Sequence, residues 1–169
     1  IVLAAHEAAV SLLEPKRPFV EVRVAAARAI ARGLSGLGLM RGDAEEAVRQ
    51  GAQALFFPHG IGHQLGLDVH DMENYGEKWV GYNGMPRSEQ FGLSALRLGK
   101  ALRPGMAHTI EPGIYFIPEL IARWKAAKKF TDFIAYEKLD SWLDFGGIRN
   151  EENWLITERG ARKLGPEFD

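Results

Sequence analysis

The 169-residue chain contains no cysteine. This absence excludes disulfide bonds, thiolate nucleophiles and cysteine-based zinc sites together. Histidine and the carboxylate side chains remain as the strong metal ligands. Any metal site in this chain would therefore be built from nitrogen and oxygen.

The chain also has no excess of either charge and no long apolar run. Lys and Arg number 21 against 22 for Asp and Glu, a net charge of -1. We therefore expect no nucleic-acid partner and no attraction to anionic membranes. No apolar run approaches the roughly 20 residues of a membrane-spanning helix, and the N-terminus lacks the order of a signal peptide. We expect a cytoplasmic protein with no membrane association.

What is present is ordinary for a globular domain, with 46% hydrophobic and 25% charged residues. The length is about that of one domain and is enough to hold a hydrophobic core. The first residue is Ile1 rather than Met, and it lies directly inside a helical pattern. We therefore expect a piece of a longer protein.

Three helices are predicted in the first third of the chain. Residues 2–13 are rich in Ala, Leu and Val and stop before a proline. In residues 20–34 apolar side chains recur every three or four positions, which predicts a second helix. Asp43 followed by Glu46 resembles a capping box, which predicts a third helix that closes at Gly51.

The second helix carries three arginines that its apolar stripe does not include. The stripe runs through Val20, Val24 and Leu34, whereas the other positions hold Arg23, Arg28 and Arg32. The pattern therefore predicts that all three arginines lie off the buried face.

After Gly51 the sequence changes to short apolar runs separated by Gly and Pro, a texture typical of strands. We expect strands at residues 54–57, 106–110, 114–117 and 154–156. A helical insertion opens at Pro118.

Three of the five histidines, His59, His63 and His70, fall within twelve residues. The spacing of His59 and His63 would suit a zinc site on a helix, but Gly60 and Gly62 between them disfavour a helix. An extended strand would also put both rings on one face. The alternative is a glycine-rich turn with surface histidines, and composition alone leaves both interpretations open.

Two further segments place carboxylates at strand ends. Glu111 follows an apolar run and precedes a Pro-Gly turn, and Glu151 leads into another apolar run. Strand alternation would put Arg149 and Glu151 on one face and Glu152 on the other. Each glutamate taken alone fits a solvated strand end, but together with the histidines they indicate a site.

These segments resemble the pita-bread metallopeptidases, which share the creatinase/aminopeptidase fold. Within that family they are similar to the proline-specific branch of Xaa-Pro dipeptidases (prolidases) and Xaa-Pro aminopeptidases. Residues 59–71 resemble the branch's HGxGHxxGLxVHD stretch, residues 111–113 its EPG strand and residues 147–151 its GIRxE strand. The resemblance implies an α+β, partial pita-bread fold in which helices pack on a curved, mainly antiparallel sheet.

The resemblance also implies a two-metal hydrolase that cleaves the peptide bond before proline in a proline-containing peptide or dipeptide. Two divalent ions, manganese foremost and cobalt or zinc as alternatives, would share two Asp, one His and two Glu and activate a water. His63, Glu111 and Glu151 match the His and Glu ligands by motif position.

The remaining site residues are carried over in the same way. His59 and His70 are implied to contact substrate or the tetrahedral intermediate, with Glu111 taking up the proton of the attacking water and Arg149 supporting the site. A homodimeric parent protein is a further expectation.

The family's two Asp ligands lie on strands before the first helix, and this sequence starts after that point. We therefore expect residues 1–169 to be the C-terminal part of the catalytic domain, without its first half and without the family's N-terminal domain. Alone, the chain is expected to be inactive and to hold one weakly bound metal ion or none.

Three alternatives remain open. A pita-bread domain that binds peptides or proteins without catalysis, and a creatinase-like domain without metals, are both disfavoured by the retained His and Glu positions. Dipeptidase and aminopeptidase are undecided. The insertion between Ile117 and Asp144 resembles prolidases, whereas residues 71–74 and 80–82 resemble certain bacterial aminopeptidases.

Overall fold

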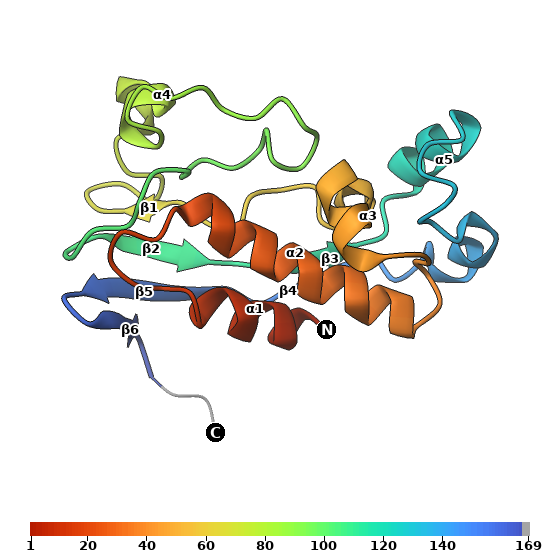
Figure 1. Cartoon of the computed structure of the whole chain (residues 1–169), viewed down its shortest axis with the longest axis horizontal. Coiled ribbons are helices and arrows are strands. Elements are labelled where there is room, and N and C mark those ends of the chain that lie inside the picture. Colours follow the sequence, from red (N-terminus) through yellow and green to blue (C-terminus); the bar gives the residue numbers. More distant parts are fainter. Residues whose placement is uncertain (167–169) are drawn as a thin grey trace.

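A computed structural model describes residues 1–166. Helices α1 (Val2–Val10) and α2 (Phe19–Gly36) pack against each other and lie along an antiparallel sheet (Figure 1). Phe19 at the start of α2 meets the ring of His108 in the sheet edge to face, with 5.2 Å between the ring centroids. The expected α+β class, with helices packed on a mainly antiparallel sheet, is confirmed.

The second predicted helix is present, but one of its arginines is not where the pattern placed it. Arg23 is fully buried, whereas Arg28 and Arg32 are exposed and bind Glu45. The expectation for Arg23 is therefore wrong. The buried face of α2 includes Phe19 and Val22 and is wider than the stripe, because helix, loop and sheet all contact it.

Of the other two helices, the first is shorter than predicted and the third ends at Gly51 as predicted. Helix α1 ends at Val10, because the N–H groups of Leu12 and Leu13 donate to carbonyls three residues back, as in a 3₁₀ turn. Helix α3 (Ala44–Gln50) begins where the Asp43 carboxylate accepts from the Glu46 N–H at 2.7 Å, and it ends at Gly51 with φ of 89°. Only this half of the capping box forms, since the Glu46 carboxylate binds Arg49 and Gln50 instead.

The strand predicted at residues 54–57 is wrong. The chain there forms a 3₁₀ helix, η1 (Ala52–Leu55), and Phe56 and Phe57 both donate to the Gln53 carbonyl. Every residue of this run is buried. A run buried on all sides has no hydrophobic period, so the pattern could not distinguish a helical turn from a strand.

The strands form two sheets, and one pairing in each continues the same register. A four-stranded antiparallel sheet has the order β1 (Gln64–Leu65), β2 (Ala107–Ile110), β5 (Glu152–Thr157), β6 (Gly160–Leu164), and β3 (Gly113–Tyr115) pairs with β4 (Gly147–Arg149). These two pairings are the β2–β5 ladder and the β3–β4 ladder. Ile110 pairs with Glu152 before the break between the ladders, and Gly113 pairs with Arg149 after it. Glu111 and Glu151 therefore occupy opposing positions in the break.

The strands expected at 106–110 and 154–156 are thus confirmed. The strand expected at 114–117 is β3, which begins one residue earlier and ends at Tyr115. Two long connections contain further helices, the first between β1 and β2 and the second between β3 and β4. One contains η2 (Glu73–Tyr75) and α4 (Glu77–Val80), and the other contains α5 (Pro118–Ala126) and η3 (Tyr136–Trp142). Helix α5 opens at Pro118 as predicted and buries Ile121 and Trp124. Among the helices of residues 1–166, none has the length and apolar character needed to cross a membrane.

Candidate functional site

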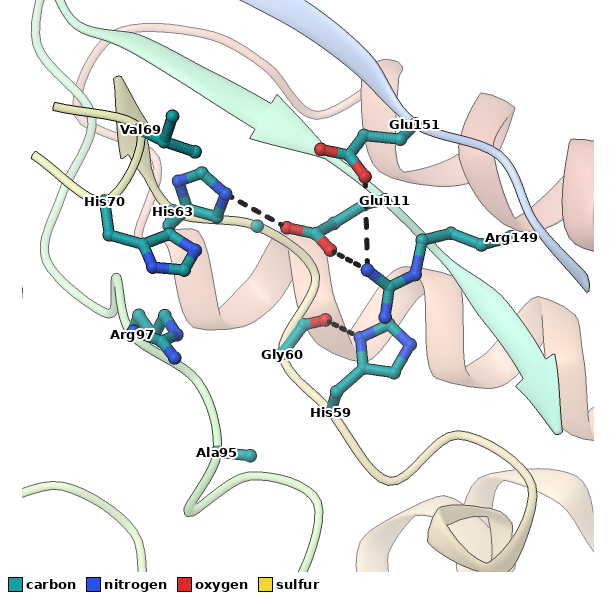
Figure 2. A pocket seen from close by; sticks show the side chains of 11 residues that line it. His59, Gly60, His63, Val69, His70, Ala95, Arg97, Glu111, Arg149 and Glu151 are labelled. Carbon is teal, nitrogen blue, oxygen red and sulfur yellow. Dashed lines mark hydrogen bonds and ion pairs between the residues drawn. The ribbon is translucent and has the colours of Figure 1, made fainter. Parts of the chain in front are cut away.

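A pocket of about 380 Å³ lies where the β2–β5 ladder meets the glycine-rich loop before β1 (Figure 2). All the predicted site residues line it: His59, His63, His70, Glu111, Arg149 and Glu151. The residues come from segments up to 92 positions apart in the printed sequence, so only the fold brings them together.

His63, Glu111 and Glu151 form the centre of this pocket. One possible ligand atom from each, an imidazole nitrogen or a carboxylate oxygen, lies within 4.8 Å of the other two. His63 Nε2 is 3.5 Å from Glu111 Oε1. One imidazole and two carboxylates are a donor set that suits manganese, cobalt or zinc.

The histidine is held in the form that a metal needs. His63 Nδ1 is 3.0 Å from the Gln64 carbonyl oxygen, which can only accept, so Nδ1 donates and Nε2, which faces Glu111, is the nitrogen left to bind a metal. Backbone hydrogen bonds hold the loop against β2 and the residue after it. The Thr109 N–H donates to the His63 carbonyl, and the Glu111 N–H donates to the Ile61 carbonyl. The chemistry of these residues therefore fits a divalent metal ion.

Glu111 is held on both of its oxygens. Thr109 Oγ1 donates to Oε1 at 3.0 Å, and the Arg149 guanidinium donates to Oε2 at 2.9 Å. Arg149 also lies 4.0 Å from Glu151 and donates to the Tyr115 hydroxyl at 2.7 Å. One guanidinium thus connects both carboxylates to β3, as Figure 2 shows for the two glutamates.

His59 is neutral in this environment. Its burial, and next the positive charge of Arg149, lower its pKa to about 4. The Nδ1 atom is 2.7 Å from the Gly60 carbonyl oxygen and therefore donates, which leaves the buried Nε2 as an acceptor without a partner among residues 1–166. His70 is exposed and meets the His63 ring edge to face at 4.2 Å.

The predicted division of faces around Glu151 is confirmed, with one difference. Arg149 and Glu151 line the pocket, whereas Glu152 lies on the helix side, 3.3 Å from His6 and 2.9 Å from Lys163. The difference is that the face opposite the pocket is covered, because the Glu152 side chain is only 14% exposed. Helix α1 covers this part of β5, which the strand pattern does not reveal.

One charged residue of the pocket was missed in the sequence. Arg97 lines it opposite the glutamates and binds Glu73 at the start of η2. Its neighbours Leu96 and Leu98 are buried, so the local pattern is that of a strand with a surface arginine. Only the close approach of this segment to Gly60, where an added Cβ would lie 3.0 Å from Leu96, brings Arg97 to the pocket.

Gly62 gives a testable measure of how tightly the loop is held on β2. A Cβ at this position would lie 2.0 Å from the Thr109 carbonyl oxygen. We expect Gly62→Ala to lower the free energy of unfolding by about 1–3 kcal/mol, because the backbone beside His63 must move. Gly36→Ala at the end of α2 is the control, since nothing lies within 4 Å there. It should be neutral or stabilising by up to about 1 kcal/mol in urea titrations, and equal losses would contradict the prediction.

Residues 1–158 match the model of metallopeptidase family M24. The chain belongs to this family. Human Xaa-Pro dipeptidase is 35% identical over 163 residues, which are 96% of this chain and 32% of that protein. The Xaa-Pro dipeptidase of Rattus norvegicus is 40% identical over 131 residues, 78% of this chain and 25% of that protein.

Solved structures agree with this assignment to M24. Aminopeptidase PepP of Pseudomonas aeruginosa is 33% identical with a TM-score of 0.64, and zinc-substituted Escherichia coli aminopeptidase P in complex with product is 31% identical with a TM-score of 0.67. Both matches cover 96% of this chain and 29% of the other. The expected partial pita-bread fold is confirmed. The M24 chain spans a quarter to a third of the length of the two curated relatives named above.

Proposed function

We propose that this chain is part of a proline-specific peptidase, an Xaa-Pro dipeptidase or Xaa-Pro aminopeptidase, that hydrolyses the peptide bond before proline. The observation that carries the proposal is the meeting of His63, Glu111 and Glu151 within 4.8 Å inside a pocket. Relatives with both names support it at 31–35% identity over 96% of the chain.

In this proposal His63, Glu111 and Glu151 hold divalent metal, with manganese as our first choice and cobalt or zinc as alternatives. When bound, a pair of such ions makes a water nucleophilic at neutral pH and polarises the scissile carbonyl. Two Asp ligands from a preceding part of the parent protein would complete the set. We further propose that residues 1–169 are the C-terminal part of the catalytic domain; the length of the relatives supports only that the chain corresponds to a part of such a protein.

The chain's own groups then have separate tasks. Glu111 is the proposed base, because its Oε1 faces the pocket beside His63 while Arg149 holds Oε2. Arg149 orients Glu111 by donating to its Oε2 and lies 4.0 Å from Glu151.

His59 and His70 would have opposite roles toward the substrate, His59 as a hydrogen-bond acceptor and His70 as a donor. Neutral His59 accepts at Nε2, so it suits an N–H of the peptide rather than an oxygen that gains negative charge. We therefore propose His70 as the donor to the scissile carbonyl oxygen.

The test is hydrolysis by the complete parent protein. We expect turnover of Xaa-Pro dipeptides or of longer Xaa-Pro peptides with manganese, and none of matched Xaa-Ala peptides. We expect the isolated 169-residue chain to be inactive, because three ligands cannot hold two ions. Peptide binding by the parent without hydrolysis would favour the non-catalytic alternative, and full turnover by the isolated chain would contradict the proposed division of the domain.

A further inference from the structure

Helix α2 carries a fully buried arginine whose position points to a role in the pocket. Arg23 has no carboxylate within ion-pair distance among residues 1–166. Its Nη2 donates to the Phe57 carbonyl at 2.9 Å and its Nε to the His59 carbonyl at 3.2 Å. The guanidinium lies 3.7 Å from the centroid of the Phe57 ring.

Helix packing alone does not explain an arginine here. An uncompensated charge is costly to bury, and burial lowers the pKa of Arg23 to about 9. One of its nitrogens, Nη1, has no partner among the described residues. An apolar side chain would fill the same space beside Val22 and Ala26 without this cost.

The two carbonyls belong to the segment that leads into the pocket. Residues 57–59 follow η1 and are in neither ladder, so their carbonyls lack the fixed partners that a sheet provides. One rigid guanidinium that binds two carbonyls two residues apart fixes the path of this backbone. Among residues 1–166 the His59 ring donates to the adjacent Gly60 carbonyl alone, and it meets the rings of Phe57 and Tyr115 edge to face.

We infer that Arg23 is a positioning residue that acts through His59, setting where the imidazole meets the substrate. This inference rests on the proposed peptidase function. It differs from a role in stability because the effect of losing Arg23 should disappear when His59 is already absent.

The test is a double-mutant cycle in the complete parent protein. Arg23→Met keeps the length of the side chain and removes its donors, and it should lower kcat/KM about tenfold, since small displacements at a site have effects of this order. In a His59→Ala background the same change should cost less than about twofold. Arg28→Met is the matched control, because Arg28 lies on the same helix but binds Glu45 at the surface.

A second variant protects the test against a failure to fold. Arg23→Lys keeps the charge and one donor direction and should retain activity between that of the parent and that of Arg23→Met. If additive effects of Arg23→Met and His59→Ala are found, or an equal loss in Arg28→Met, the inference is overturned.

A spectroscopic readout separates this inference from the proposed function. In the complete protein with ¹³C-labelled histidine rings, His59→Ala identifies the His59 signal. Arg23→Met should shift that signal and leave the signal of His6, which contacts β5, in place. An unmoved His59 signal overturns the inference. If His59→Ala does not change kcat/KM, the proposed role of His59 fails, while the shift still decides whether Arg23 positions the ring.

Discussion

Glu151→Gln in the complete parent protein is expected to lower kcat/KM about 10³-fold or more, a loss of about 4 kcal/mol in transition-state stabilisation. Glu152→Gln is expected to leave kcat/KM within about twofold. The two residues are neighbours in the chain, so the comparison tests the direction of each side chain.

The physical reason lies in what each carboxylate contacts. Glu151 faces His63 and Glu111 in the pocket, and an amide there would supply a weaker ligand without negative charge. Glu152 points to the opposite side of β5, where it meets His6 and Lys163. Its replacement should therefore affect stability rather than turnover.

Both variants would be compared by kcat/KM with an Xaa-Pro substrate and by urea unfolding. Glu111→Gln is a positive control and should be at least as inactive as Glu151→Gln. A crippled Glu152→Gln beside a near-normal Glu151→Gln would mean that the site is assigned to the wrong glutamate.

His63→Ala is expected to weaken divalent metal binding about 100-fold or more, whereas His59→Ala should leave it nearly unchanged. His63 offers a ring nitrogen within 4.8 Å of an oxygen of each glutamate, whereas the positive charge of Arg149 acts on His59 and disfavours a cation there. Loss of one of three ligands removes most of the affinity of a site that is already incomplete.

The measurement is titration calorimetry with Mn²⁺ on the 169-residue chain and on the parent. In the isolated chain we expect at most one weakly bound ion. His70→Ala, which removes a neighbouring ring and no proposed ligand, is the matched control. Equal losses for His63→Ala and His59→Ala, or a larger loss for His59→Ala, would contradict the assignment.

The sequence patterns located the elements that follow simple periods and missed those that depend on several neighbours. The Asp43 cap, helix α5 and the strands that lead to Glu111 and from Glu151 follow from local rules. The 3₁₀ turn at Ala52–Leu55 does not, because burial on all sides removes the period on which the interpretation depends.

The site shows the same division. Neither helix nor strand geometry places His59 and His63, since the glycine-rich loop between them is irregular and held by bonds to β2 and α2. The resemblance to a family supplied their assignment, and the spacing alone left it open. Arg23 could not be separated from Arg28 in the sequence, because both lie off the apolar stripe and only the tertiary fold buries one of them.

The break between the two ladders has a consequence for how this part of the family tolerates change in length. Glu111 and Glu151 oppose each other because the pairing keeps its register on both sides of the break. Opposed residues of antiparallel strands stay roughly 4.5–5.5 Å apart at their Cα atoms, whatever the chain does beyond the hairpin. The connection that holds α5 and η3 can therefore grow or shrink without altering the spacing of the two carboxylates, whereas a single residue added between Ile110 and Gly113 would move one of them off its partner.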